Sequence, residues 1–140
     1  MNESCWTERI LTKGNGRSFM SDKDKTTFLA KHRFARISPR KVRPLAQLVR
    51  GKFVDDALHI LKYQPHRGAR LLEKVIESAM ANARDPDQNP GRILEAKDLY
   101  IKQIKVDGGP MFKRVRPRAR GMAFMIKKRM SHIEVEVEQL

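Results

Sequence analysis

Residues 108–133 read GGPMFKRVRPRARGMAFMIKKRMSHI and hold eight Lys or Arg residues among 26, with no Asp or Glu. Like charges at this density repel one another, and the segment has too few large side chains to bury them under a core of its own. It becomes stable when a polyanion surrounds it, because fixed cations then replace condensed counterions. The partner that this stretch predicts is therefore nucleic acid phosphate.

Two segments with strand periodicity flank this basic stretch. Downstream, residues 133–138 read IEVEVE, an alternation typical of a half-buried strand with an acidic outer face. Upstream, residues 99–106 indicate another strand, although the alternation at 99–102 is imperfect. Together they predict a long hairpin over about residues 107–132. At ~3.3 Å per residue, arms of roughly 12 residues would reach ~40 Å, beyond the body of a domain this size.

The whole chain is small and strongly basic. Its 140 residues suffice for one domain with a modest core, and 30 basic against 16 acidic residues give a formal net charge of +14. Solubility alone needs less charge, so the excess again predicts an acidic partner. Cys5 is the single cysteine, which excludes a disulfide within the chain, and the four histidines are too scattered for a zinc site. We expect no cofactor.

The location is expected to be reducing and cytoplasmic. No apolar run approaches the ~18 to 20 residues that span a bilayer, and the N-terminus lacks the positive charge of a signal peptide.

Residues 1–27 hold five basic and four acidic groups and are expected to form a flexible extension. Met20 begins a segment that looks like a natural protein start, so the first 19 residues are hypothesised to be a dispensable tail or a misassigned start; intact-mass measurement of the native protein would test this.

One strand and a first helix are predicted directly after this extension. The strand is expected from Phe28 to Ile37. Ser38 then suits the N-cap of a helix, Pro39 its first position, and Gly51 its C-terminal stop. Apolar residues at i, i+3, i+4 and i+7 give this helix one buried face. They are Val42, Leu45, Ala46 and Val49.

Two further helices follow. The second is expected to bury Val54, Ala57, Leu58 and Leu61, with Asp55 and Asp56 favourably placed in its first turn. Pro65 is expected to open the third, which ends around residues 82–84, before the helix-breaking sequence DPDQNPG. The buried stripe of the third helix is Ala69, Leu72, Ile76, Ala79, Met80 and Ala83, with Val75 beside it. Its alanines indicate close packing against neighbouring elements.

Two basic patches are candidates for phosphate binding. In the hairpin, apolar side chains that would be a liability in water are interleaved with the cations, and Arg outnumbers Lys four to one in residues 113–120. The planar Arg fork binds phosphate bidentately and stacks on bases. The second patch is SPRKVR at residues 38–43 with Arg50 and Lys52, at a helix N-terminus whose free N–H groups also suit phosphate. The alternatives are a solvated loop and an ordinary solvated helix face.

Two other function classes compete with this interpretation. Residues 39–62 could be a helix-turn-helix for duplex DNA, but Asp55 and Asp56 would stand where the recognition helix meets the DNA and would repel phosphate. A DNA-binding regulator would be supported by a symmetric dimer that footprints a defined site. For an enzyme acting on RNA, turnover abolished by one His or Asp substitution would be required. No nucleophile–base arrangement or phosphate-cradling loop stands out, so we expect no enzymatic activity.

The chain strongly resembles the bacterial type of the L-twenty-two family of large-subunit ribosomal proteins. The resemblance rests on ISPRKVRPLAQLVRGK at 37–52, VIESAMANA at 75–83 and GGPMFKRVRPRARGMAFMIKKRMSHIEVEV at 108–137, and covers about residues 28–138. Departures are small. Phe53 stands where the family often has a polar helix cap, and Met122 where a basic residue is common.

The resemblance implies an α+β fold, with three helices packed on a small antiparallel sheet and a long protruding β-hairpin. It implies a structural constituent of the large ribosomal subunit, in which residues 28–140 bind large-subunit ribosomal RNA and support assembly. The hairpin would line the nascent-peptide exit tunnel. The implied partners are ribosomal RNA, neighbouring large-subunit proteins and the nascent peptide.

The site residues combine the two basic patches with this resemblance. The expected RNA-binding residues are Arg36, Ser38, Arg40, Lys41, Arg43, Arg50, Lys52, Lys113, Arg114, Arg116, Arg118, Arg120, Lys127, Lys128 and Arg129. The expected tunnel-tip residues are Arg116, Pro117, Arg118, Ala119, Arg120 and Gly121.

Overall fold

The computed structural model describes residues 27–85 and 94–139. The predicted flexible extension lies outside these residues, except for Thr27, which begins the first strand. The elements, in chain order, are β1 (Thr27–Ala35), α1 (Pro39–Val49), α2 (Val54–Lys62), α3 (Arg67–Arg84), β2 (Leu99–Pro117) and β3 (Ala123–Gln139). The predicted α+β class, with three helices, an antiparallel sheet and a long hairpin, is confirmed.

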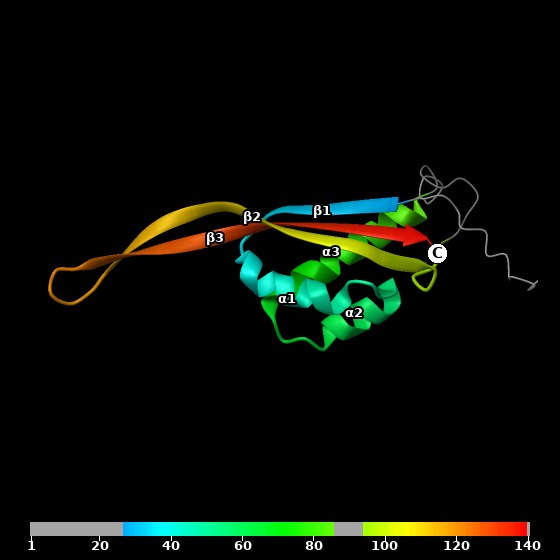
Figure 1. Cartoon of the computed structure of the whole chain (residues 1–140), viewed down its shortest axis with the longest axis horizontal. Helices are drawn as coiled ribbons and strands as arrows, with labels where there is room; N and C mark the ends of the chain where they lie inside the picture. The colour runs from blue at the N-terminus through cyan, green and yellow to red at the C-terminus, as the bar shows by residue number, and fades with distance from the viewer. Residues whose placement is uncertain (1–26, 86–93, 140) are drawn as a thin grey trace, which may run out of the picture.

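The sheet is antiparallel with the order β1-β3-β2, so β3 is the central strand. All three helices lie on one side of it, and the outer halves of β2 and β3 extend past the helices as a two-stranded arm (Figure 1). The predicted alternation of β3 places Ile133, Val135 and Val137 in the core, each no more than 1% exposed. In β2 the imperfect alternation has a structural reason. The register shifts between Ile101 and Gln103, and this bulge turns both Ile101 and Ile104 inward.

The acidic face of β3 is neutralised rather than left acidic. Because β3 is central, its glutamates lie between the lysines of its two neighbours. Glu134 pairs with Lys31 of β1 at 3.0 Å. Glu136 and Glu138 pair with Lys105 and Lys102 of β2 at 2.8 and 3.0 Å, and Glu138 is only 6% exposed. The sheet therefore has a balanced charge ladder on the face away from the core.

Helix α1 follows its prediction closely. Ser38 has the extended backbone of an N-cap and Pro39 opens the helix, although the Ser38 side chain makes no capping hydrogen bond within the described residues. Gly51 adopts φ 75°, the left-handed conformation that ends many helices. The predicted apolar face is buried in full. It comprises Val42, Leu45, Ala46 and Val49.

Two predicted boundaries were wrong by two residues. Helix α3 begins at Arg67 rather than at Pro65, with His66 as its N-cap, because Pro65 lies in the connection before the cap. Strand β1 ends at Ala35 rather than at Ile37. The predicted stripe of α3 is otherwise buried, with Met80 only half-buried. Its fully buried alanines allow α3 to pack closely, as expected.

Candidate nucleic-acid interface

The hairpin leaves the domain at a pair of bulges. Strand β1 shifts register within residues 32–35 and β2 within residues 108–111, both opposite the same short part of β3. Phe34 adopts φ 59° there, donates its backbone N–H to Nδ1 of His132 at 3.1 Å, and packs edge-on against that ring at 4.9 Å. A Cβ at Gly109 would lie 3.1 Å from Nε2 of His132. Bulges bend strands and increase twist, so this cluster sets the direction of the hairpin.

Beyond the bulges, β2 and β3 pair without interruption from Met111↔Arg129 to Pro117↔Ala123. Pro117 therefore takes part in the last pair of the ladder rather than blocking it. The turn is closed by the Arg118 N–H, which donates to the Met122 carbonyl at 2.7 Å. Of the predicted tip residues, Arg116 and Pro117 belong to β2, while Arg118, Ala119, Arg120 and Gly121 form the turn.

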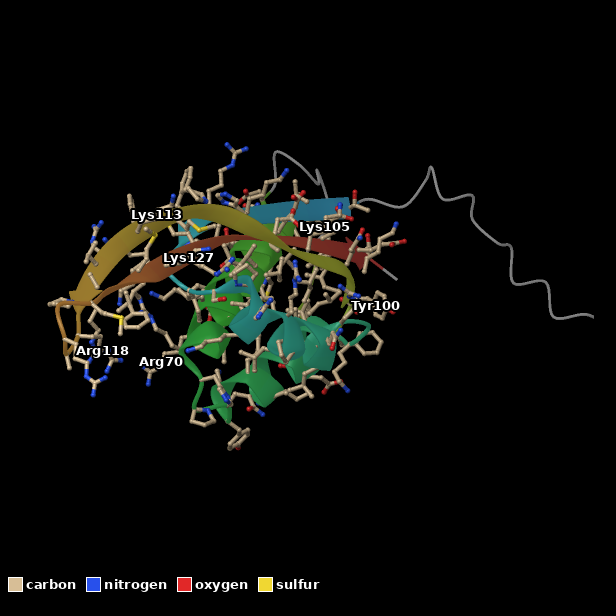
Figure 2. The ribbon with its side chains drawn as sticks, turned by 60° about the vertical axis from the view of Figure 1, so that its left-hand side comes forward. Arg70, Tyr100, Lys105, Lys113, Arg118 and Lys127 are labelled. Atoms are coloured by element: carbon tan, nitrogen blue, oxygen red, sulfur yellow. The ribbon has the colours of Figure 1, made fainter. Side chains whose placement is uncertain are left out.

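The part of the hairpin beyond the bulges, residues 111–129, is called the distal hairpin. It exposes both its cations and most of its apolar side chains. All eight Lys and Arg residues between positions 113 and 129 are exposed. Lys113, Lys127 and Arg118 are labelled along this arm in Figure 2. Most of its large apolar residues are also in solvent, with exposed fractions from 42% at Met111 to 70% at Val115, while Ile126 is half-buried. A surface of this kind indicates a binding site, because apolar patches left in water are costly.

The two faces of the distal hairpin differ in chemistry. Cross-strand partners share a face and successive residues alternate, so the register defines both sets. The arginine–phenylalanine face holds Phe112, Arg114, Arg116, Phe124, Ile126 and Lys128. The lysine–methionine face holds Met111, Lys113, Val115, Met125, Lys127 and Arg129. On the first face, the Arg114 guanidinium lies 5.4 Å from the centre of the Phe112 ring. That face suits stacking on bases, whereas the second offers point charges and flexible apolar chains.

Two of the basic residues predicted to bind RNA are turned toward the protein. Arg43 donates from Nε and one terminal nitrogen to the Val106 carbonyl at 3.3 and 3.2 Å. Arg50 donates to the Ile104 carbonyl at 2.7 Å. Both carbonyls belong to β2, an edge strand. These two arginines therefore tie α1 to the edge of the sheet.

The segment after α1 also covers the β2 edge of the sheet. Gly51 donates to the Ile101 carbonyl at 3.1 Å, and the Ile101 N–H donates to the Lys52 carbonyl at 2.9 Å. Phe53 forms a bridge with Tyr100, and the two rings meet edge-on at 6.3 Å. The aromatic residue at this N-cap of α2 is thus used for packing. The Lys52 side chain is exposed, as is that of Arg40.

A groove of about 1120 Å³ brings the two predicted patches together. Its walls are the start of α1, the start of α3 and the base of the hairpin. The predicted residues that line it are Arg36, Ser38, Lys41, Arg114, Lys127, Lys128 and Arg129. The sequence predictions missed two more, His66 and Arg67. The available signal was a basic residue at the start of α3, where acids normally favour the helix dipole.

Within the described residues, no helix is both long and apolar enough to cross a membrane.

Comparison with known proteins finds a matching family model and several curated relatives. The family model described as ribosomal protein L22p/L17e matches residues 30–138. Among curated proteins, the large ribosomal subunit protein uL22 of Rhodopirellula baltica is 67% identical over 108 residues, covering 77% of this chain and 91% of the relative. The same-named protein of Caldicellulosiruptor saccharolyticus is 50% identical over 107 residues, covering 76% and 84%. That of Thermotoga sp. is 45% identical over 130 residues, covering 93% and 79%.

Proposed function

The chain belongs to the ribosomal protein L22p/L17e family, and from that premise we propose that it binds large-subunit ribosomal RNA and supports assembly of the subunit. Its role is structural, within the ribosome. Neighbouring large-subunit proteins are expected partners, and the cytoplasmic ribosome is the expected location.

One observation carries the RNA-binding proposal. The distal hairpin presents eight exposed cations and a row of exposed apolar side chains, with no carboxylate between residues 108 and 133. Among polyanions, folded RNA satisfies both sets at once, because phosphates take the cations and sugars and bases take the apolar groups. Recognition would follow the shape of folded RNA, since side chains cannot read the narrow A-form major groove.

The same hairpin is proposed to line the nascent-peptide exit tunnel. Its two strands are paired to within one turn of the tip, and a two-stranded ribbon is only about 5 Å between strand axes. A ribbon this thin fits between RNA segments where a helix pair would not. Arg116, Arg118 and Arg120 would then contact tunnel-wall RNA, and the turn would lie next to the nascent peptide.

The test removes the three tip arginines together, as Arg116→Ala, Arg118→Ala and Arg120→Ala. Binding of the full chain to deproteinised large-subunit RNA is measured over a range of salt concentrations. The log–log salt slope should fall by about 2 to 3, because each lost phosphate contact removes ~0.7 to 0.9. Thermal unfolding of the free protein should stay cooperative with an unchanged midpoint, since all three side chains are exposed.

The matched control removes three exposed lysines of the globular body, Lys62→Ala, Lys74→Ala and Lys97→Ala. It changes the net charge equally and should leave the salt slope nearly unchanged. Equal slopes for the two triple variants would contradict the proposal, as would failure of the full chain to co-sediment with large subunits.

A further inference from the structure

The groove between the helices and the hairpin lies where the globular body and the arm meet. One wall carries Ser38, Lys41 and Arg67 from the starts of α1 and α3, and the other carries Lys127, Lys128 and Arg129 from β3. In Figure 2 the hairpin arches to one side of the helices, with Lys127 labelled on β3. A ligand in this groove would therefore touch both the globular body and the hairpin.

A close helix contact forms the floor of the groove. A Cβ at Gly68 would lie 3.0 Å from Cδ1 of Leu45 and 3.5 Å from Cδ1 of Ile37, so glycine allows the start of α3 to lie directly against α1. This contact places Arg67 of α3 beside Lys41 of α1 at the same groove. Buried packing thus fixes the backbone positions from which the two cations project.

The groove differs in charge balance from the outer face of the sheet. On the sheet, Lys31 and Lys105 have glutamate partners at 3.0 and 2.8 Å. Among the described residues that line the groove, seven are Lys or Arg and none is Asp or Glu. Neither α1 nor α3 has an acid in its first turn, whereas α2, which opens elsewhere, has Asp55 and Asp56. Cations at these helix starts oppose the helix dipole, so local stability does not explain them.

We propose that this groove binds one backbone segment of ribosomal RNA, with phosphates held between Lys41 and Arg67 on the body and Arg114 and Lys128 on the hairpin. This inference rests on the proposed function. The lining also includes Ile37, Leu45, Phe112 and Met130, which would pack against sugars and base edges. An acidic peptide would neutralise the cations, but it has no sugars or planar bases to pack against these apolar side chains. RNA is therefore the better fit.

The proposal has a mechanical consequence. A single RNA segment that contacts both walls fixes the hairpin relative to the body. The bulges at residues 32–35 and 108–111 bend the sheet at this same level, so the hairpin direction that they set would be secured by the bound RNA.

The first experiment compares two double variants of the full chain. Lys41→Ala with Arg67→Ala removes two positive charges from one wall of the groove. Lys62→Ala with Lys74→Ala removes the same charge from exposed positions outside the groove. Binding to deproteinised large-subunit RNA should weaken at least ~10-fold more in the groove variant, and its salt slope should fall by about 1.4 to 1.8 for two lost phosphate contacts. The charge-preserving pair Lys41→Arg with Arg67→Lys should retain most of the affinity, which separates charge from misfolding.

The second experiment asks whether both walls meet the same RNA. A photoreactive phenylalanine analogue replaces Arg67 in one protein and Lys128 in another, and each is cross-linked to the deproteinised RNA. The proposal expects both to mark the same short stretch, within a few nucleotides. Cross-links to separate stretches would overturn it, as would equal affinities of the two double variants.

Failure of this inference can be told from failure of the proposed function. If the tip-arginine triple variant loses RNA affinity but the groove variant matches its control, only the groove proposal fails. If the unaltered protein does not bind the RNA, both fail. Competition of an oligoglutamate with the RNA as effective as that of an oligouridylate of equal charge would instead point to an acidic protein partner and contradict the groove proposal.

Discussion

Strands β2 and β3 lie in two different environments along their length. The comparison shows that backbone pairing between strands is separate from stabilisation by a hydrophobic core. Near the helices, Val135 is fully buried in the core. In the distal hairpin, Val115 is 70% exposed on the same two-stranded ladder. Backbone pairing continues through both regions. An isolated two-stranded ribbon is at best marginally stable in water. The distal hairpin therefore needs an external partner in place of a core.

Charge shows the same difference. Lys102 and Lys105 of β2 lie 3.0 and 2.8 Å from glutamates of β3 in the body. Residues 108–133 have eight cations and no acid of their own. These lysines of the sheet thus have acidic partners within the chain, and the cations of the hairpin are proposed to be neutralised by the phosphates of its partner.

The largest expected effect is on the free energy of unfolding, when the same Val→Ala substitution is made in the core and in the distal hairpin. Val135→Ala should lower the free energy of unfolding by about 2–3 kcal/mol, because it removes buried methyl groups and leaves a cavity. Val115→Ala should change it by less than about 0.5 kcal/mol, as exposed substitutions usually do. Denaturant unfolding of the two variants measures both. A large loss from Val115→Ala would show that the hairpin has a core of its own.

A smaller effect should distinguish the two faces of the hairpin. Phe112→Leu with Phe124→Leu removes both rings from the arginine–phenylalanine face. Base stacking is worth ~1–3 kcal/mol per base, so affinity for large-subunit RNA should fall about tenfold or more. The control, Met111→Leu with Met125→Leu, alters the lysine–methionine face without removing a ring and should have little effect. Equal losses in a filter-binding titration would rule out stacking as the difference between the faces.

The smallest effect concerns the charge ladder of the body. The hydrogen bond to Glu136 raises the pKa of Lys105 above its ordinary value of 10.5. A raised folded-state pKa contributes stability that is fully present below pH 10.5 and is lost as the pH rises through the folded value. Glu136→Gln should therefore cost a little stability at neutral pH, and the difference from the unaltered protein should shrink above pH 10.5. A difference that grows with pH in denaturant titrations would contradict this origin.

Local and periodic features were predictable from the sequence. Pro39 and Gly51 marked the ends of α1, and the i, i+3, i+4, i+7 spacing between them identified its buried face. Strict alternation identified the core residues of β3. The basic stretch between two strands predicted the hairpin. These features depend on neighbours within a few residues, so one segment of sequence contains the information.

Features that depend on tertiary contacts were not predictable in this way. Arg43 and Arg50 looked like free cations on a helix, but their partners are carbonyls more than fifty residues away. Arg67 gave only a weak signal, a cation at a helix start, and its place in the groove depends on the packing of Gly68 against α1. The left-handed Phe34 reflects a bulge whose partner, His132, lies 98 residues away. Periodicity carries no information about which distant segments meet.

Amide hydrogen exchange on the free protein and on its complex with large-subunit RNA tests the central contrast most directly. In the free protein, residues 111–117 and 123–129 should exchange much faster than residues 133–137, because the distal ladder has no core beneath it. On RNA, the distal amides should become protected while those of the core change little. Distal amides that are as protected as the core in the free protein, and unchanged by RNA, would contradict the account.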